Sequence, residues 1–261
     1  MATNGLLTTL RDGKVALGLG MMYPAAGIIE GMCRGWDFVW IDAQHGQFTP
    51  ASALSAVQAA AATGVETLLR VPGHEHSTLA THADLAPSAI MVPMVNSAAE
   101  AEAVVAGLTL PPRGVRSYGG RRVIDLYGRR FHEDYELMIV VQIETPEGLD
   151  NVEAIAATEG VDCLFFGPDD MKLRMGLGIE TAVADSPALQ EAMRRTAAAA
   201  RKAGVFCGFI APDVAGLKAG LDMGYRMVVG GADVSFLRTQ AAARLAEFRS
   251  ALDARGAAPQ G

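Results

Sequence analysis

Residues 138–167, MIVVQIETPEGLDNVEAIAATEGVDCLFFG, show most clearly the pattern from which the fold is predicted. It opens with a mostly apolar run, Met138–Glu144, and closes with a second one, Cys163–Gly167. Runs of this kind are typical of parallel strands that are buried on both faces. Between them, residues 147–157 are rich in alanine and helical in character. The stretch therefore predicts a strand, a helix and a second strand parallel to the first.

The same alternation continues along the whole chain of 261 residues. We expect strands at Val15–Gly20, Phe38–Asp42, Thr67–Val71, Ala89–Pro93, Met138–Glu144, Cys163–Gly167, Val205–Ile210 and Met227–Gly230. We expect helices over residues 24–33, 52–62, 75–84, 97–107, 147–157, 186–203, 212–222 and 233–252. Eight strand-then-helix units predict an α/β fold, a single (β/α)8 TIM barrel. We assign residues 1–252 to this barrel and residues 253–261 to a flexible C-terminal tail.

A doubly wound sheet that binds a dinucleotide is the main structural alternative. Such a sheet carries the glycine pattern G-x-G-x-x-G after its first strand. Here the corresponding residues are Gly18-Leu19-Gly20-Met21-Met22-Tyr23, so tyrosine stands where the third glycine belongs. The sequence therefore gives little support to dinucleotide binding.

Composition and charge exclude several classes of protein. The formal net charge is −7, from 22 Lys and Arg against 29 Asp and Glu, so we expect no nucleic-acid partner. The N-terminus lacks a basic start followed by an apolar run, and no apolar stretch is long enough to span a membrane. The cysteines, Cys33, Cys163 and Cys207, are scattered, and we expect reduced core thiols in a cytoplasmic protein.

Polar residues follow several of the predicted strands at their carboxyl ends. In a barrel of this kind the active site lies at that end of the strands. The residues concerned are Asp42, His45, Arg70, Gln142, Glu144, Asp169 and Asp170. Nothing comparable stands at the amino ends of the strands.

Glu144 and Asp170 follow adjacent strands and both carry oxygen donors. Hard divalent cations such as Mg²⁺ or Mn²⁺ are held by one or two carboxylates, while substrate or water fills the other positions. The pair therefore favours a metal site. A general acid/base pair, or two solvated loop carboxylates, is the alternative.

Arg70 and His45 are the other candidates for chemistry. The Arg70 guanidinium suits a carboxylate or a developing enolate, and a structural pair with Asp42 is its alternative. A neutral His45 imidazole could take and return a proton if a carboxylate orients it, and Asp42 and Asp84 are candidates for that role. The alternative for His45 is a hydrogen-bonded loop anchor.

Other histidines and the lysines are less informative. His74, His76 and His82 lack the cysteines or the H-E-x-x-H pattern of zinc sites, and we expect them on a solvated helix face. A Schiff-base enzyme needs a desolvated lysine that faces the barrel interior. None of the four lysines is placed for this, so carbonyl chemistry here would use a metal.

A long connection, residues 111–135, carries six arginines in an otherwise acidic protein. Long loops in compact domains are often functional. The loop predicts either a surface that faces an anion, which favours an acceptor with carboxylate or hydroxyl groups, or ion pairs across a subunit interface.

Six short motifs occur in order along the chain: Asp42-Ala43-Gln44-His45-Gly46, Leu69-Arg70-Val71-Pro72, Met91-Val92-Pro93, Pro111-Pro112-Arg113-Gly114-Val115-Arg116, Val141-Gln142-Ile143-Glu144-Thr145 and Phe166-Gly167-Pro168-Asp169-Asp170-Met171. Together they resemble the HpcH/HpaI aldolase family, metal-dependent class II pyruvate aldolases of the phosphoenolpyruvate/pyruvate barrel superfamily. The resemblance extends from about residue 15 to 235, in order and at suitable spacing.

The resemblance implies a set of metal and substrate ligands. Glu144 and Asp170 would bind a divalent cation (Mg²⁺, Mn²⁺ or Co²⁺) that a 2-oxoacid chelates. Gln142 and the backbone N–H groups of Asp169 and Asp170 would contact that substrate.

The resemblance also implies a catalytic group and an assembly. Arg70 would bind substrate and stabilise the enolate oxygen, His45 would be the general base, and Asp84 would raise its basicity. Homohexamers would form from dimers that exchange the last barrel helix. Gln44 and Ala86 depart from the family, which often has Glu and Gly at these positions.

The expected function is reversible cleavage of 4-hydroxy-2-oxoacids to an aldehyde and pyruvate, or a close 2-oxoacid such as hydroxypyruvate. Two alternatives stay open. One is a 2-oxoacid decarboxylase or thioester lyase on the same metal site, and the other is a catalytically silent barrel.

Overall fold

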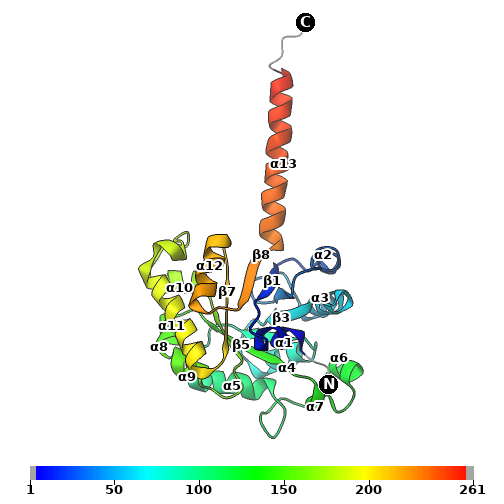
Figure 1. The fold of residues 1–261 in the computed structure, drawn as a ribbon. Coiled ribbons are helices and arrows are strands. Elements are labelled where there is room, and N and C mark those ends of the chain that lie inside the picture. The colour runs from blue at the N-terminus through cyan, green and yellow to red at the C-terminus, as the bar shows by residue number, and fades with distance from the viewer. Residues whose placement is uncertain (1–3, 257–261) are drawn as a thin grey trace.

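Eight parallel strands close into a barrel in chain order, as the sequence predicts (Figure 1). The computed structural model describes residues 4–256, with side chains to residue 254. The strands are β1 (Ala16–Met21), β2 (Phe38–Asp42), β3 (Glu66–Arg70), β4 (Ala89–Val92), β5 (Met138–Ile143), β6 (Cys163–Phe166), β7 (Phe206–Ile210) and β8 (Met227–Ala232). The fold is the expected (β/α)8 TIM barrel.

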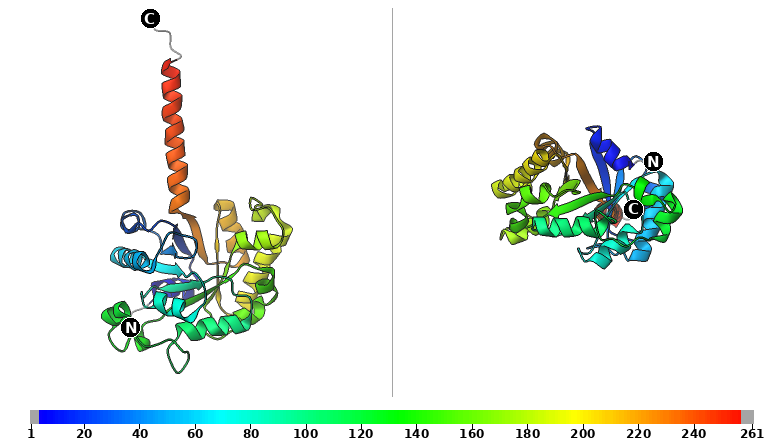
Figure 2. Two further views of the ribbon diagram at one scale, coloured as in Figure 1. Left: turned by 180° about the vertical axis from the view of Figure 1, so that it is seen from behind. Right: turned by 90° about the horizontal axis from the view of Figure 1, so that it is seen from below.

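Helices surround the strands, which is clearest in the view from below (Figure 2). They are α2 (Ala26–Met32), α3 (Pro50–Thr63), α4 (His76–Ala83), α5 (Ala98–Leu108), α8 (Pro146–Asp150), α9 (Val152–Ala156), α11 (Pro187–Ala203) and α12 (Val214–Met223). Local signals set their ends: α3 begins after a Thr49 cap and ends at Gly64, whose φ of 74° favours glycine. The helix expected over 147–157 is two short helices that meet at Asn151.

A short helix that the sequence pattern did not predict, α1 (Gly5–Arg11), closes the amino-terminal end of the barrel. Its Leu6, Leu7 and Leu10 are buried in one cluster with Trp40 and Phe165 from the barrel interior. Asn4 caps the helix: its side chain accepts a hydrogen bond from the Leu7 N–H and donates to the carbonyls of Ser88 and Glu136. This cap anchors α1 to the segments that lead into β4 and β5.

The arginine-rich connection also lies at the amino-terminal end, because it leads into the start of β5. It contains α6 (Arg121–Tyr127) and α7 (Phe131–Asp134), which lie away from the end where α13 (Asp233–Gly256) leaves the barrel (Figure 1). The proposed contact between this loop and an acceptor at the carboxyl rim is therefore not formed within one chain. Several of its arginines pair locally instead: Arg121 with Asp125 and Arg130 with Glu133.

The last helix, α13, projects from the barrel instead of packing on its side (Figures 1 and 2). Asp233 anchors its start by accepting hydrogen bonds from the N–H groups of Met22 and Tyr23, at 2.9 and 3.0 Å. Every side chain from Ser235 to Ala254 is exposed. The helix continues past residue 252 to Gly256, so the first part of the predicted tail is helical; residues 257–261 lie outside the described residues.

Three further expectations can be compared with the structure. Cys33, Cys163 and Cys207 are buried free thiols, as predicted. Within residues 4–256, no helix has the length and apolar character needed to cross a membrane. The expectation for His82 is wrong: it is 4% exposed, and its Nδ1 lies 2.7 Å from the Thr78 carbonyl oxygen.

Candidate active site

Asp42 and Arg70 form a buried ion pair at the carboxyl ends of β2 and β3, where the strand register places them side by side. Nε and Nη2 of Arg70 donate to the two carboxylate oxygens of Asp42 at 2.9 and 2.6 Å. The guanidinium lies over the Trp40 ring, 4.7 Å from its centroid, a cation–π contact from inside the barrel. The pair that sequence analysis left as an alternative for Arg70 is therefore formed.

Arg70 nevertheless keeps donors for a ligand. Its Nη1 lies 3.4 Å from Oε1 of Gln142, and a guanidinium has five N–H donors in all. Two of the five remain after the contacts to Asp42 and Gln142. The result is a fixed cation with directed donors at the carboxyl end of the barrel.

Asp42 also shapes the turn that carries His45. Its Oδ1 accepts hydrogen bonds from the backbone N–H groups of Gln44 and His45 at 3.0 and 3.2 Å. The turn leaves the His45 side chain exposed, with no hydrogen bond from its ring to another described residue. The Gln44 side-chain oxygen is buried and has no hydrogen-bond partner among the described residues.

Glu144 follows β5 and is 2% exposed. One of its oxygens accepts a hydrogen bond from the Met94 N–H at 2.8 Å. Burial raises the pKa of Glu144 to about 7, and the negative charge of Asp170 acts in the same direction, while the Met94 N–H, Arg70 and Arg174 oppose it. Glu144 is therefore a buried carboxylate close to a second one, with too little positive charge from the protein to compensate it.

Gly167 keeps the space between the ends of β5 and β6 open. A Cβ atom at this position would lie 2.6 Å from Oε2 of Glu144 and 2.7 Å from Nε2 of Gln142. Real Cβ atoms do not approach other atoms this closely, so a side chain here would displace both groups. The backbone of Gly167 is held in place, since its N–H donates to the carbonyl of Ile143 at 3.0 Å.

The two aspartates after β6 lie on a further unpredicted helix, α10 (Pro168–Arg174), and have different environments. Asp170 is half-buried and near enough to Glu144 to raise its pKa. Asp169 is exposed and accepts a hydrogen bond from Nζ of Lys172 at 2.9 Å. Lys172 also lies 3.3 Å from the Ile179 carbonyl, so its ammonium holds the start of α10 to the following loop. It is an ion-paired structural lysine.

The donor set fits a hard divalent cation. The carboxylates of Glu144 and Asp170 are close enough for their charges to interact, and Glu144 lies beside Gly167 together with the side-chain amide of Gln142. Within the described part of the chain, no group of three or more His, Cys, Asp or Glu side chains is arranged to hold a metal. Two protein ligands would thus leave most coordination positions to substrate and water, an arrangement that Mg²⁺-type sites commonly use.

Asp84 does not meet His45 within one chain. It stands at the end of α4, which precedes β4, so it lies at the amino-terminal end of the barrel, whereas His45 follows β2 at the carboxyl end. Its carboxylate accepts a hydrogen bond from Nη2 of Arg116 at 2.7 Å, and Arg116 is 3% exposed. The family resemblance implies a common role for both residues, but within one barrel they lie at opposite ends.

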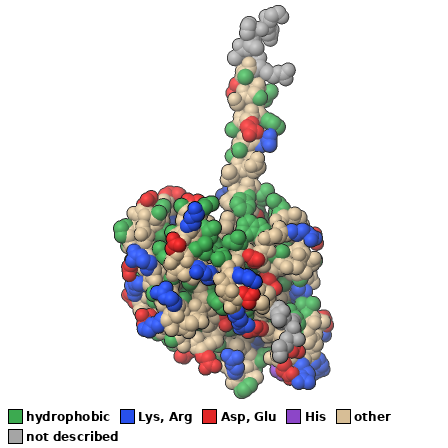
Figure 3. Space-filling view, viewed as in Figure 1, with side chains coloured by type: hydrophobic (Ala, Val, Ile, Leu, Met, Phe, Trp, Pro, Cys, Tyr) green, Lys and Arg blue, Asp and Glu red, His purple; other side chains and the backbone are tan. Residues whose placement is uncertain are grey.

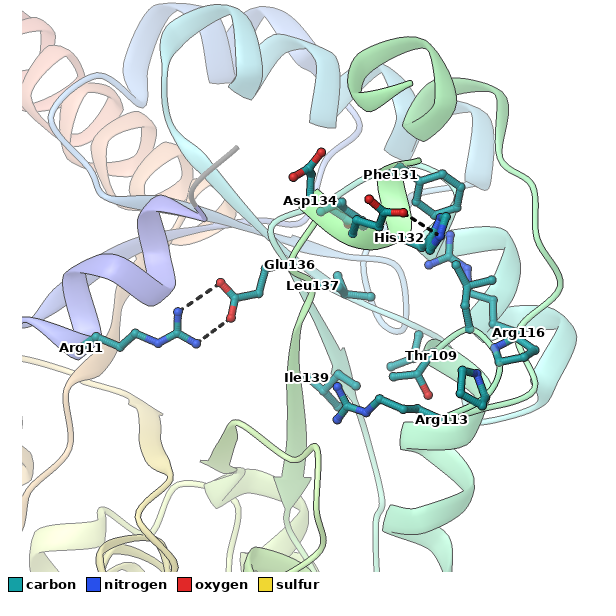
Figure 4. Close-up of a pocket in the computed structure, with 16 residues that line it drawn as sticks. Arg11, Thr109, Arg113, Arg116, Phe131, His132, Asp134, Glu136, Leu137 and Ile139 are labelled. Carbon is teal, nitrogen blue, oxygen red and sulfur yellow. Dashed lines mark hydrogen bonds and ion pairs between the residues drawn. The ribbon is translucent and has the colours of Figure 1, made fainter. Parts of the chain in front are cut away.

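One hollow of the described structure lies away from this site (Figure 4). It measures about 750 Å³ and lies at the amino-terminal end, between the arginine-rich connection and the start of β5. Arg113, Arg116, Phe131, His132 and Ile139 are among its lining residues. It is well separated along the strands from Glu144 and Asp170, so it is not the candidate active site.

A closed barrel with an acidic pair, a fixed arginine, an amide and a histidine at the carboxyl ends of its strands defines a TIM-barrel enzyme. A model of the HpcH/HpaI aldolase/citrate lyase family matches residues 26–239. The chain belongs to this family. The family and its named relatives are aldolases, which are carbon–carbon lyases.

Individual relatives can be aligned with this chain over almost its full length. The chain is 33% identical over 260 residues to 4-hydroxy-2-oxovalerate aldolase of Novosphingobium aromaticivorans, with 97% of each chain covered. It is 34% identical over 269 residues to hydroxypyruvate/pyruvate aldolase of Delftia acidovorans, with 99% of this chain and 97% of that one covered. A crystal structure of a family member from Burkholderia cenocepacia matches with a TM-score of 0.86 at 32% identity, over 95% of this chain and 100% of that chain.

Sequence analysis missed supporting groups in the site. The backbone of Met94 has a φ of 59°, unusual for a residue with a side chain, and directs its N–H at Glu144. Its position directly after the Met91-Val92-Pro93 motif was a signal for a turn. Trp40 stands two residues before Asp42 on β2, and its ring packs against the Arg70 guanidinium. Nothing in the sequence distinguishes this residue from other apolar residues of a buried strand.

Proposed function

We propose that the protein is a divalent-metal-dependent class II aldolase. It cleaves 4-hydroxy-2-oxoacids reversibly to an aldehyde and pyruvate, or a close 2-oxoacid such as hydroxypyruvate. The observation that carries this proposal is the buried Glu144 beside Asp170, next to the fixed guanidinium of Arg70. The activities named for the relatives at 33% and 34% identity support the same substrate class.

Glu144 and Asp170 would hold the cation, which we take to be Mg²⁺, Mn²⁺ or Co²⁺. When bound, such a cation supplies Lewis acidity to the keto oxygen of a 2-oxoacid. The Met94 N–H orients Glu144, and the missing side chain at Gly167 leaves room for the substrate end that chelates. We propose that Gln142 and the backbone N–H groups of Asp169 and Asp170 contact the carboxylate of that substrate.

Arg70 would stabilise the negative charge that develops on the enolate oxygen. Its pair with Asp42 and its stacking on Trp40 fix the guanidinium before substrate arrives. Preorganised donors of this kind are worth roughly 2.7–4 kcal/mol of transition-state stabilisation each.

His45 would be the general base, because it lies in the turn after β2 that Asp42, the partner of Arg70, holds by hydrogen bonds, and because its side chain is exposed. Asp84 can raise its basicity only across two copies of the chain, because within one copy it lies at the opposite end, bound to Arg116. The proposed dyad therefore requires an assembly.

We propose that α13 supplies part of that assembly by packing on a second copy. In a barrel each helix normally covers the outer face of neighbouring strands, and α13 does not. Phe236, Leu237, Leu245, Phe248 and Leu252 are exposed on it, and hydrophobic side chains also surround its base (Figure 3). An exchange of α13 would cover both surfaces, and we propose a homohexamer built from such pairs. The three buried free thiols suit a reducing, cytoplasmic location.

A cleavage assay tests the proposed activity. Chelator-stripped protein is given 4-hydroxy-2-oxopentanoate, and released pyruvate is measured before and after Mg²⁺, Mn²⁺ or Co²⁺ is added. We expect cleavage only with metal, and loss of cleavage in Glu144→Ala and Asp170→Ala variants. Near-normal turnover of either variant after metal stripping would contradict the ligand assignment.

A further inference from the structure

Arg174 is a cation at the mouth of the candidate site that neither the motifs nor the proposed mechanism uses. It lies four residues after Asp170 on α10, and residues four apart share one face of a helix. Its Nη2 lies 3.9 Å from the Met94 sulfur, and the Met94 N–H binds Glu144. Its charge also lowers the pKa of Glu144 against the effect of burial. The guanidinium is therefore close to the acidic pair, on its solvent side.

Arg174 differs from the other cations near the rim because its donors are uncommitted. Arg70 is paired with Asp42, and Lys172 with Asp169. Among the described residues Arg174 makes no ion pair, and its one contact is to a thioether sulfur, a weak acceptor. The side chain is exposed, so an incoming ligand can reach the fork of N–H groups.

We propose that Arg174 binds a carboxylate at the far end of the substrate, on the aldehyde half of the molecule. This inference rests on the proposed function. The 2-oxoacid half is assigned to the buried groups around Glu144 and Arg70, so the half that extends toward solvent passes Arg174. The planar fork matches a carboxylate in two parallel hydrogen bonds. Arg174 thus takes the role that we expected for the arginine-rich connection, which lies at the other end of the barrel.

The test compares two acceptor aldehydes that differ only in a terminal carboxylate. 4-Oxobutanoate and butanal are each condensed with pyruvate by the metal-loaded wild-type protein and by Arg174→Met and Arg174→Lys variants. Arg201→Met is the matched control, because Arg201 is an exposed arginine in the last turn of α11, outside the arginine-rich connection and its proposed contact with a second copy. For each pair, kcat and KM are measured separately.

We expect the wild type to prefer 4-oxobutanoate. Arg174→Met should lower kcat/KM for 4-oxobutanoate by roughly 10- to 100-fold, mainly through KM, since a charge-assisted hydrogen bond is lost. Butanal should be used as before, and Arg174→Lys should restore part of the preference. Arg201→Met should behave as the wild type with both aldehydes.

Exchange of the pyruvate methyl protons in deuterated buffer, with no aldehyde present, separates this inference from the proposed function. We expect Arg174→Met to exchange at the wild-type rate. An equal loss with both aldehydes, or slower exchange, would place Arg174 at the 2-oxoacid end and overturn the inference. Normal exchange with no change in the preference for 4-oxobutanoate would overturn it as well. A wild type that exchanges no protons with any metal would contradict the proposed function itself.

Discussion

Replacing Asp42 by asparagine tests how the carboxyl end of the barrel is held together. Asp42 is fully buried and accepts four hydrogen bonds: two from Arg70, and one each from the backbone N–H groups of Gln44 and His45. An asparagine side chain has nearly the same shape but no charge. Its NH₂ group would also face an Arg70 nitrogen that can only donate. Asp42→Asn therefore leaves a buried guanidinium unpaired and one donor without an acceptor.

The expected loss of stability in Asp42→Asn is large because the ion pair is buried. Removing one partner of a buried ion pair costs about 3–5 kcal/mol. For a chain of this size each kcal/mol lowers Tm by roughly 2–4 °C, so we expect a decrease of roughly 6–20 °C. Equilibrium unfolding in urea gives the free energy of unfolding, and a thermal melt gives Tm.

Asp150→Asn is the matched control for this experiment. Asp150 pairs with Arg195 at 3.2 Å, and both side chains are well exposed, so its loss should cost at most about 1 kcal/mol. If Asp42→Asn changed the free energy of unfolding no more than Asp150→Asn does, the reasoning about the buried pair would be refuted.

Three other predictions follow from particular contacts. Gly167→Ala should lower kcat strongly, because its Cβ would displace the Glu144 carboxylate; unchanged kinetics in a folded variant would contradict the close approach. Burial lowers the pKa of His82 below 6.5, so the unfolded chain binds this proton more readily and stability falls as pH drops below 6.5, by up to about 1.4 kcal/mol per pH unit. His82→Leu should remove that part of the pH dependence, whereas parallel stability curves for the two proteins would count against it. Phe248→Asp should reduce the mass measured by light scattering if α13 packs on another copy; an unchanged mass would argue against exchange of the helix.

Much of the fold could be predicted because parallel strands buried on both faces leave a continuous apolar signal. β2 lies where expected, at Phe38–Asp42, and the other strands differ from expectation by a residue or two at their ends. α1 falls outside the strand-then-helix pattern because it precedes the first strand, although Leu6, Leu7 and Leu10 have helical spacing and Asn4 is a good cap. The direction of α13 could not be predicted from the sequence. Apolar residues on a helix show that it packs on something, but they do not show whether that surface belongs to its own barrel or to another copy.

The site was predictable to the extent that strand ends gather residues. Arg70, Gln142, Glu144 and Asp170 come together because they lie at or just after the carboxyl ends of β3, β5 and β6, which share one rim. Residues that precede a strand lie at the opposite end of the barrel. Asp84 precedes β4 and the arginine-rich connection precedes β5, so neither lies at the carboxyl rim of its own chain. His82 was expected on a solvated face, but it lies three residues after the buried Leu79 and shares its side of α4.

Exchange of the methyl protons of pyruvate, measured by proton NMR in deuterated buffer, shows whether the protein forms the enolate of pyruvate and whether a metal is needed for it. Chelator-stripped protein is compared with protein to which Mg²⁺, Mn²⁺ or Co²⁺ is restored, and with a Glu144→Gln variant of confirmed fold. We expect exchange only in wild-type protein with metal, because deprotonation at C3 needs the cation held by Glu144 and Asp170. Exchange in the stripped protein, or the absence of exchange with every metal, would contradict a metal-dependent pyruvate aldolase.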